Sequence, residues 1–149
     1  MTYASVRSRY LDDTVATASP ATLLTMLYDR LVLDLRRAEA AQRSGDRSAA
    51  NGQLTHAQAI VSELISTLDV TAWDGARQLM SVYTFLLAEL VQANISGDAE
   101  RTAACRSLVE PLGEAWHQAA DQLAAGATLE PAGSVPAGIG VARGELGVG

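Results

Sequence analysis

The chain has 149 residues, of which 48% are hydrophobic and only 5% are aromatic, and its formal net charge is −6. This length is that of one ordinary domain, and the scarcity of aromatic residues means that its core must be aliphatic. All eleven basic residues are Arg and seventeen acidic residues outnumber them, so the chain lacks a basic stripe for phosphates, and nucleic-acid binding is not expected.

Residue usage also argues against a secreted or membrane protein. The single cysteine, Cys105, excludes an intramolecular disulfide and a thiolate metal cluster. The first ten residues contain no apolar segment typical of a secretory signal. No stretch approaches the roughly twenty uninterrupted apolar residues of a membrane-spanning helix. We therefore expect a soluble, cytoplasmic protein that does not insert into a membrane.

Residues 1–18 form the first predicted segment. Tyr3, Val6 and Tyr10 are spaced three and four apart, as on one face of a short helix. This spacing predicts an N-terminal cap segment that lies over part of an exposed surface when no partner is bound. A frayed terminus is the alternative interpretation.

Residues 19–125 are divided by helix start and stop signals. Ser19-Pro20 is typical of an N-cap followed by Pro at the first helical position. Similar signals recur at Ser44-Gly45-Asp46, around Asp69 to Asp74, and at Gly97-Asp98. They predict an all-α domain, an antiparallel up-and-down bundle of four helices joined by short polar turns. Pro111 inside the fourth helix predicts a kink near residues 107–111.

Residues 126–149 differ in composition from the rest of the chain. Seven of these 24 residues are Gly and two are Pro, and no apolar period runs through them. The segment is predicted to be a flexible, disordered C-terminal tail.

Two of the predicted helices carry more apolar residues than a monomeric bundle needs. One apolar stripe per helix suffices to form the core. The first helix adds Met26 and Leu33 on its opposite side, and the third adds a second stripe made of Met80, Leu87, Val91 and Ile95. Soluble monomers rarely expose large apolar patches, so we interpret these residues as a partner surface, with scattered surface residues as the alternative. Because the first and third helices lie on a diagonal, one partner covering both would wrap around the bundle.

No catalytic or metal site is expected. Glu114-Ala-Trp-His117 has the Glu-x-x-His spacing of carboxylate-bridged metal bundles, but Gln53 precedes His56 where a second Glu would be needed. No specific neighbours mark His56 as a phosphotransfer residue. Cys105 falls on the inward side of its helix and is expected to be a structural thiol. The sequence therefore predicts no enzyme activity, no metal and no cofactor.

A series of short motifs follows one order along residues 10–116. They are Thr17-Ala-Ser-Pro20, Leu23-Leu24-x-x-Leu27-Tyr28-Asp29, Ala57-Gln58-x-Ile60-Val61-x-Glu63-Leu64, Ser66-x-Leu68-Asp69, Leu79-x-x-x-Tyr83, Leu90-Val91-x-Ala93-Asn94, Asp98 and Glu114-Ala-Trp116. In this order and spacing the chain resembles the FliS family of flagellar export chaperones.

The resemblance implies a specific function. Members of the family bind the C-terminal region of newly made flagellin in the cytoplasm, prevent its premature polymerisation and help deliver it to the type III export gate component FlhA. Their N-terminal segment can occupy part of the flagellin site, which is the role expected here for Tyr10. The client-binding residues that we expect are Tyr10, Met26, Leu33, Met80, Leu87 and Val91. The alternatives are a generic helical adaptor and a homodimer that covers its own apolar patch when it is free of client.

Overall fold

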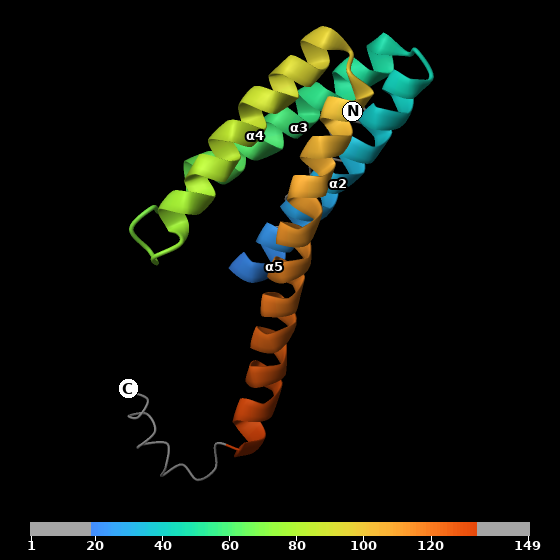
Figure 1. Ribbon diagram of the computed structural model, residues 1–149. Helices are drawn as coiled ribbons and strands as arrows, with labels where there is room; N and C mark the ends of the chain where they lie inside the picture. The colour runs from blue at the N-terminus through green and yellow to red at the C-terminus, as the bar shows by residue number, and fades with distance from the viewer. Residues whose placement is uncertain (1–18, 134–149) are drawn as a thin grey trace, which may run out of the picture.

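The computed structural model describes residues 19–133, which form four α-helices (Figure 1). They are α2 (Pro20–Arg43), α3 (Arg47–Thr67), α4 (Ala76–Ser96) and α5 (Ala99–Gly133). α2 packs against α3 and α5, and α4 packs against the same two helices, so α2 and α4 lie on a diagonal. The predicted all-α four-helix fold is confirmed. The predicted cap segment with Tyr10 and residues 134–149 lie outside the described residues.

Polar caps and glycines set the helix ends at most of the predicted places. The Ser19 hydroxyl accepts a hydrogen bond from the Thr22 N–H at 3.1 Å, and the Asp46 carboxylate accepts one from the Ala49 N–H at 3.0 Å. Gly97, with φ of 67°, ends α4 in the left-handed conformation that glycine adopts without steric cost. The carboxylate of Asp98, the next residue, then caps the start of α5. These bonds satisfy backbone groups that a helix end leaves without partners.

The last helix is longer than the sequence analysis predicted. α5 continues to Gly133, so residues 126–133 are helical and the predicted tail does not begin at residue 126. The helix also continues through Pro111 without a break in the stretch where a kink was predicted. Pro111 is exposed, so its ring meets solvent rather than a neighbouring helix. Extending an existing helix avoids the cost of nucleation, which explains how it tolerates poor helix formers.

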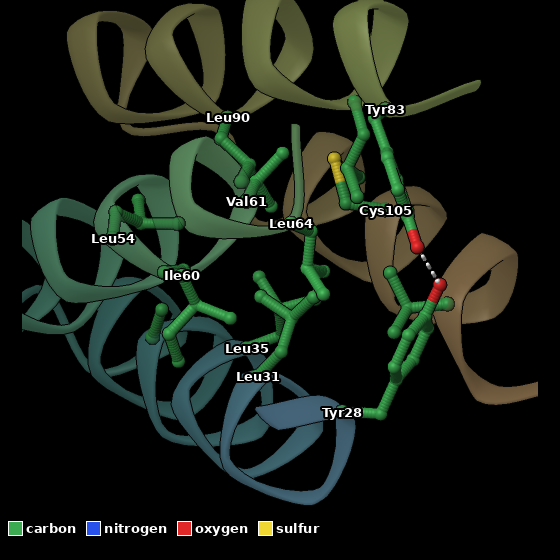
Figure 2. Packing of buried hydrophobic residues seen from close by; sticks show 14 of the residues in the cluster. Tyr28, Leu31, Leu35, Leu54, Ile60, Val61, Leu64, Tyr83, Leu90 and Cys105 are labelled. Carbon is green, nitrogen blue, oxygen red and sulfur yellow. Dashed lines mark hydrogen bonds between the residues drawn. The ribbon is translucent and has the colours of Figure 1, made fainter. Parts of the chain in front are cut away.

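The core is mainly aliphatic, as predicted, and it includes the buried thiol of Cys105 (Figure 2). Its buried members come from all four helices: Tyr28, Leu31, Leu35, Ala38, Leu54, Ala57, Ile60, Val61, Leu64, Leu79, Tyr83, Leu86, Leu90, Ala93, Cys105 and Val109. Trp116 packs partly buried against this core, with its ring centroid 6.5 Å from that of Tyr28. One charged residue, Asp34, is fully buried on α2, where it contacts Arg30 and His56.

Leu123 follows Leu112, Trp116 and Ala119 at intervals of three and four residues, which is the spacing of one apolar stripe along α5, yet it is exposed. Its side chain is 65% exposed. Figure 1 shows the reason, because the C-terminal part of α5 extends beyond the ends of the neighbouring helices. A residue there has the correct periodicity for the core but no helix to pack against.

Candidate functional site

α4 is the most unusual helix of the bundle because it is apolar on more than one side. Among the described helices it alone is long and apolar enough, by length and composition, to cross a membrane. Here one side of α4 contributes Leu79, Tyr83, Leu86 and Leu90 to the core. Val91 remains 36% exposed, Phe85 59% and Ile95 67%. Apolar residues of this size on the surface are candidates for contact with a partner.

The second apolar stripe of α4 borders the groove between α3 and α4. Asn94 lies on the side of α4 that faces α3, because its side-chain amide donates a hydrogen bond to the carbonyl oxygen of the Asn51 side chain at 2.7 Å. Met80 and Leu87 precede Asn94 at intervals of seven residues and therefore share its side of the helix. Met80 is half-buried, and Leu87 is half-buried and packs against the core. We call Met80, Leu87, Val91 and Ile95 the α4 stripe.

Leu33 belongs to a different groove, between α2 and α5. Its side chain is 37% exposed and lines a cavity of about 430 Å³ together with Tyr28, Val32 and Gly113. We call this cavity the α2/α5 pocket. Met26, seven residues before Leu33 and hence on the same side of α2, is half-buried. The structure therefore divides the predicted client residues that it describes between two surfaces, one on α2 and one on α4, and Tyr10 lies outside the described residues.

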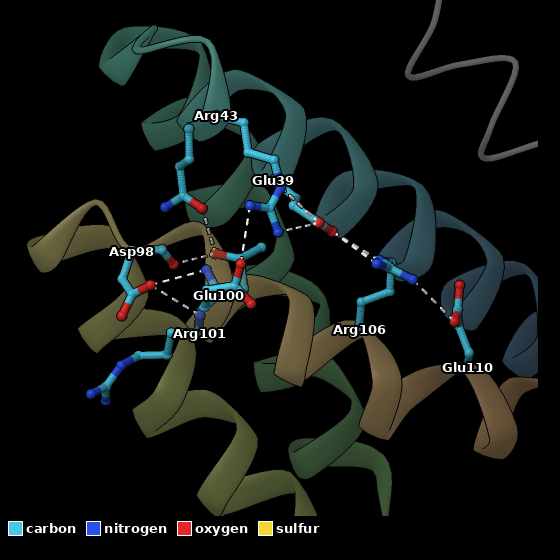
Figure 3. Close-up of polar contacts among 9 residues, drawn as sticks. Glu39, Arg43, Asp98, Glu100, Arg101, Arg106 and Glu110 are labelled. Carbon is cyan, nitrogen blue, oxygen red and sulfur yellow. Dashed lines mark hydrogen bonds and ion pairs between the residues drawn. The ribbon is translucent and has the colours of Figure 1, made fainter.

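Beyond the α2/α5 pocket, ion pairs join α2 and α5 along the rest of the groove. Figure 3 shows the ladder, in which Arg106 joins Glu39 at 3.0 Å to Glu110 at 3.4 Å. Arg43 extends it by contacting Glu39 at 2.9 Å and Glu100 at 3.1 Å. Hydrogen bonds from Arg43, and then from Arg106, lower the pKa of Glu39. This part of the groove is polar and already paired, so it offers no apolar surface to a partner.

Two exposed aromatic residues were missed by the sequence analysis. Phe85 is the only phenylalanine of the chain, and it lies four residues before Glu89, whose carboxylate pairs with Arg101 of α5 at 3.3 Å. Phe85 therefore lies on the α5 side of α4, opposite the α4 stripe. Trp73, in the connection between α3 and α4, is 49% exposed. Exposed aromatic side chains are frequent binding hot spots, and their rarity in this chain was the available signal.

The two histidines that the sequence analysis considered for chemistry take part in pairs between helices. The His117 Nε2 atom lies 2.6 Å from an Asp29 carboxylate oxygen, and His56 contacts the buried Asp34. The described residues contain no group of three His, Cys, Asp or Glu side chains arranged to hold a metal ion. Burial, followed by the charge of Glu89, raises the pKa of the Cys105 thiol to about 11.

Comparisons with known proteins relate this bundle to flagellar proteins. The family model described as flagellar protein FliS matches residues 2–123. The flagellar secretion chaperone FliS of Bacillus subtilis is 33% identical over 110 residues, which cover 74% of this chain and 82% of the relative. The chaperones of the same name from Salmonella typhimurium and Escherichia coli are 31% and 26% identical, each over 72% of this chain and over 82% and 81% of the relative.

Proposed function

Because this chain belongs to the FliS family, a family of chaperones and not of enzymes, we propose that it is a flagellar secretion chaperone whose client is the C-terminal region of flagellin. In this proposal the chaperone acts in the cytoplasm, where it keeps the bound segment from premature polymerisation. It then aids delivery of the client to the export gate component FlhA.

The observation that carries the proposal is the exposed part of the α4 stripe. Val91 and Ile95 are spaced four apart on α4, so they form an apolar strip along the helix beside α3. An amphipathic client segment can lay its own apolar face along such a strip, as in helix-in-groove recognition. A client that is disordered when free would fold as it binds.

The position of the second surface fits a client that wraps. Leu33 and the α2/α5 pocket lie on the helix diagonal to α4. A single straight helix reaches only one of the two grooves, whereas a segment made of two or more short helices reaches both. Tyr10 stays in the proposal as a removable cap from residues 1–18.

Calorimetric titration of the full chain with a peptide from the C-terminal region of the same organism's flagellin tests this function. We expect saturable 1:1 binding with a negative heat-capacity change and a gain of helical circular dichroism. Absence of binding, together with a mass that rises with protein concentration, would favour instead a homodimer that buries the α4 stripe.

Substitutions on α4 then locate the contact. Val91→Asp and Ile95→Asp should each weaken peptide binding by about tenfold or more, because a buried carboxylate would lie against an apolar client. Gln92→Asp is the matched control, since it adds the same charge at an exposed position of the same helix. Leu87→Asp is unsuitable because Leu87 packs against the core. Equal losses in all three variants would show that the α4 stripe is not the client site.

A further inference from the structure

The α2/α5 pocket combines an apolar floor with a charged rim. Tyr28, Val32 and Leu33 of α2 form its apolar lining. Gly113 of α5 faces Tyr28, and a Cβ atom at that position would lie 3.6 Å from the Tyr28 side chain. Glycine costs stability inside a helix, and here its missing side chain leaves the α5 wall of the pocket open.

Carboxylates predominate among the charged groups on this rim. Asp29, Glu110 and Glu114 line the pocket with one guanidinium, that of Arg36, and the His117 imidazole. Arg36 is paired with Glu110 at 2.8 Å, and His117 contacts Asp29 at 2.6 Å. Among the side chains that the structure describes, none forms an ion pair or a hydrogen bond with the Glu114 carboxylate. The rim thus has a surplus of negative charge above an apolar floor.

We propose that the α2/α5 pocket binds a basic side chain, Arg or Lys, of the bound flagellin segment. Such a side chain has an aliphatic stem that packs on apolar surface and a charged end that stays at the polar rim. The stem would lie on Val32 and Leu33, and the cation would pair with Glu114. An acidic client residue would be repelled by the same rim. This inference rests on the proposed function, and it specifies the chemistry of one anchor of that client.

The test is a double-mutant cycle between chaperone and client, measured by calorimetry with the full chain. In the flagellin peptide, each Arg or Lys is replaced by Gln in turn. In the chaperone, the replacement is Glu114→Gln. For one peptide position we expect the single replacement and Glu114→Gln each to weaken binding about fivefold to tenfold. Combining the two should cost little more than either alone, because both remove the same pair.

A charge-matched control separates the pocket from the general acidity of the chain. Glu63 is an exposed carboxylate on α3 with no ion-pair partner among the described residues, so Glu63→Gln removes the same charge at a position outside the pocket. It should leave the affinity within about twofold of wild type at physiological salt. Glu114→Arg alone, or Glu alone at the coupled peptide position, should reduce binding. The two changes together exchange the charges of the pair and should restore binding.

The outcomes distinguish this inference from the proposed function. Suppose that the native peptide binds, but that Glu114→Gln weakens the binding of every Arg or Lys replacement peptide as much as that of the native peptide. The proposal of a basic anchor is then wrong, and the chaperone function stands. The same holds if a peptide without any basic residue binds as tightly as the native one. If the native peptide does not bind to the wild-type chain, both proposals fail together.

Discussion

The hydroxyl groups of Tyr28 and Tyr83 lie 2.7 Å apart in the core and join α2 to α4 across the diagonal of the bundle (Figure 2). Both side chains are almost fully buried, at 1% and 3% exposure. Burial raises the pKa of each phenol, so both stay neutral at physiological pH and one can donate to the other. The two helices that carry the proposed client surfaces are thus connected directly through this bond.

Tyr28→Phe is expected to lower the free energy of unfolding by about 1–2 kcal/mol, because it leaves the Tyr83 hydroxyl buried without this partner. Adding Tyr83→Phe should cost little more, since the second change removes the group that was left unpaired. Urea unfolding of the two single variants and the double variant measures these values. Additive losses would contradict a direct bond between the two hydroxyls.

The fold could be predicted from local signals, whereas the composition of the site could not. Ser19, Asp46 and Asp98 cap helices through neighbours within three residues, so their role is visible in the sequence. Whether an apolar residue on a second stripe is exposed depends on how closely the next helix packs. Leu87 touches the core while Val91 is partly exposed, although both were predicted on one surface.

The exposure of single residues could not be predicted from periodicity for a related reason. The periodicity of the fourth helix includes Leu123, but periodicity does not indicate how far the neighbouring helices extend. Phe85 was missed because a single exposed aromatic residue produces no period at all. The place of Gly113 in the wall of a pocket could not be predicted either, because it depends on contact with α2.

Replacing Pro111 by Ala is expected to stabilise the protein by about 1–3 kcal/mol. Proline has no N–H to donate to the Ser107 carbonyl, and an interior proline costs about 3 kcal/mol relative to Ala. Part of this gain is lost because Ala gives the unfolded chain more conformational freedom. Ser107→Ala, at an exposed position on the same helix, should change stability by less than about 0.5 kcal/mol. Equal stability of Pro111→Ala and wild type in urea unfolding would show that α5 adapts to proline without cost.

The Cys105 thiol is expected to react slowly with a disulfide reagent in the native protein. Its pKa of about 11 leaves almost no thiolate at about pH 8, and burial in the core blocks access. Unfolding in urea should restore the rate of an ordinary cysteine. The matched control carries Cys105→Ala and Ser107→Cys, which moves the thiol to an exposed position of the same helix. Native wild type reacting as fast as this control would show that the core around Cys105 opens readily.

His117 is expected to titrate above the ordinary histidine value of about 6.5. A hydrogen bond to Asp29 raises its pKa, and the charges of Asp29 and Asp121 act in the same direction. Because this pKa is raised, the contact of His117 on α5 with Asp29 on α2 stabilises the fold. Its contribution is fully present at pH values below the pKa that His117 has in the unfolded chain. This contribution disappears as the pH rises through the folded-state pKa, when the imidazole loses its charge.

Proton NMR of the imidazole ring measures this shift, and Asp29→Asn should return the pKa of His117 toward the ordinary value. Asp121→Asn should lower it less, because that carboxylate acts only through its charge. Both groups are largely exposed, so added salt should reduce the shift. A pKa that is the same in wild type and Asp29→Asn would show that the 2.6 Å contact between α2 and α5 does not persist in solution.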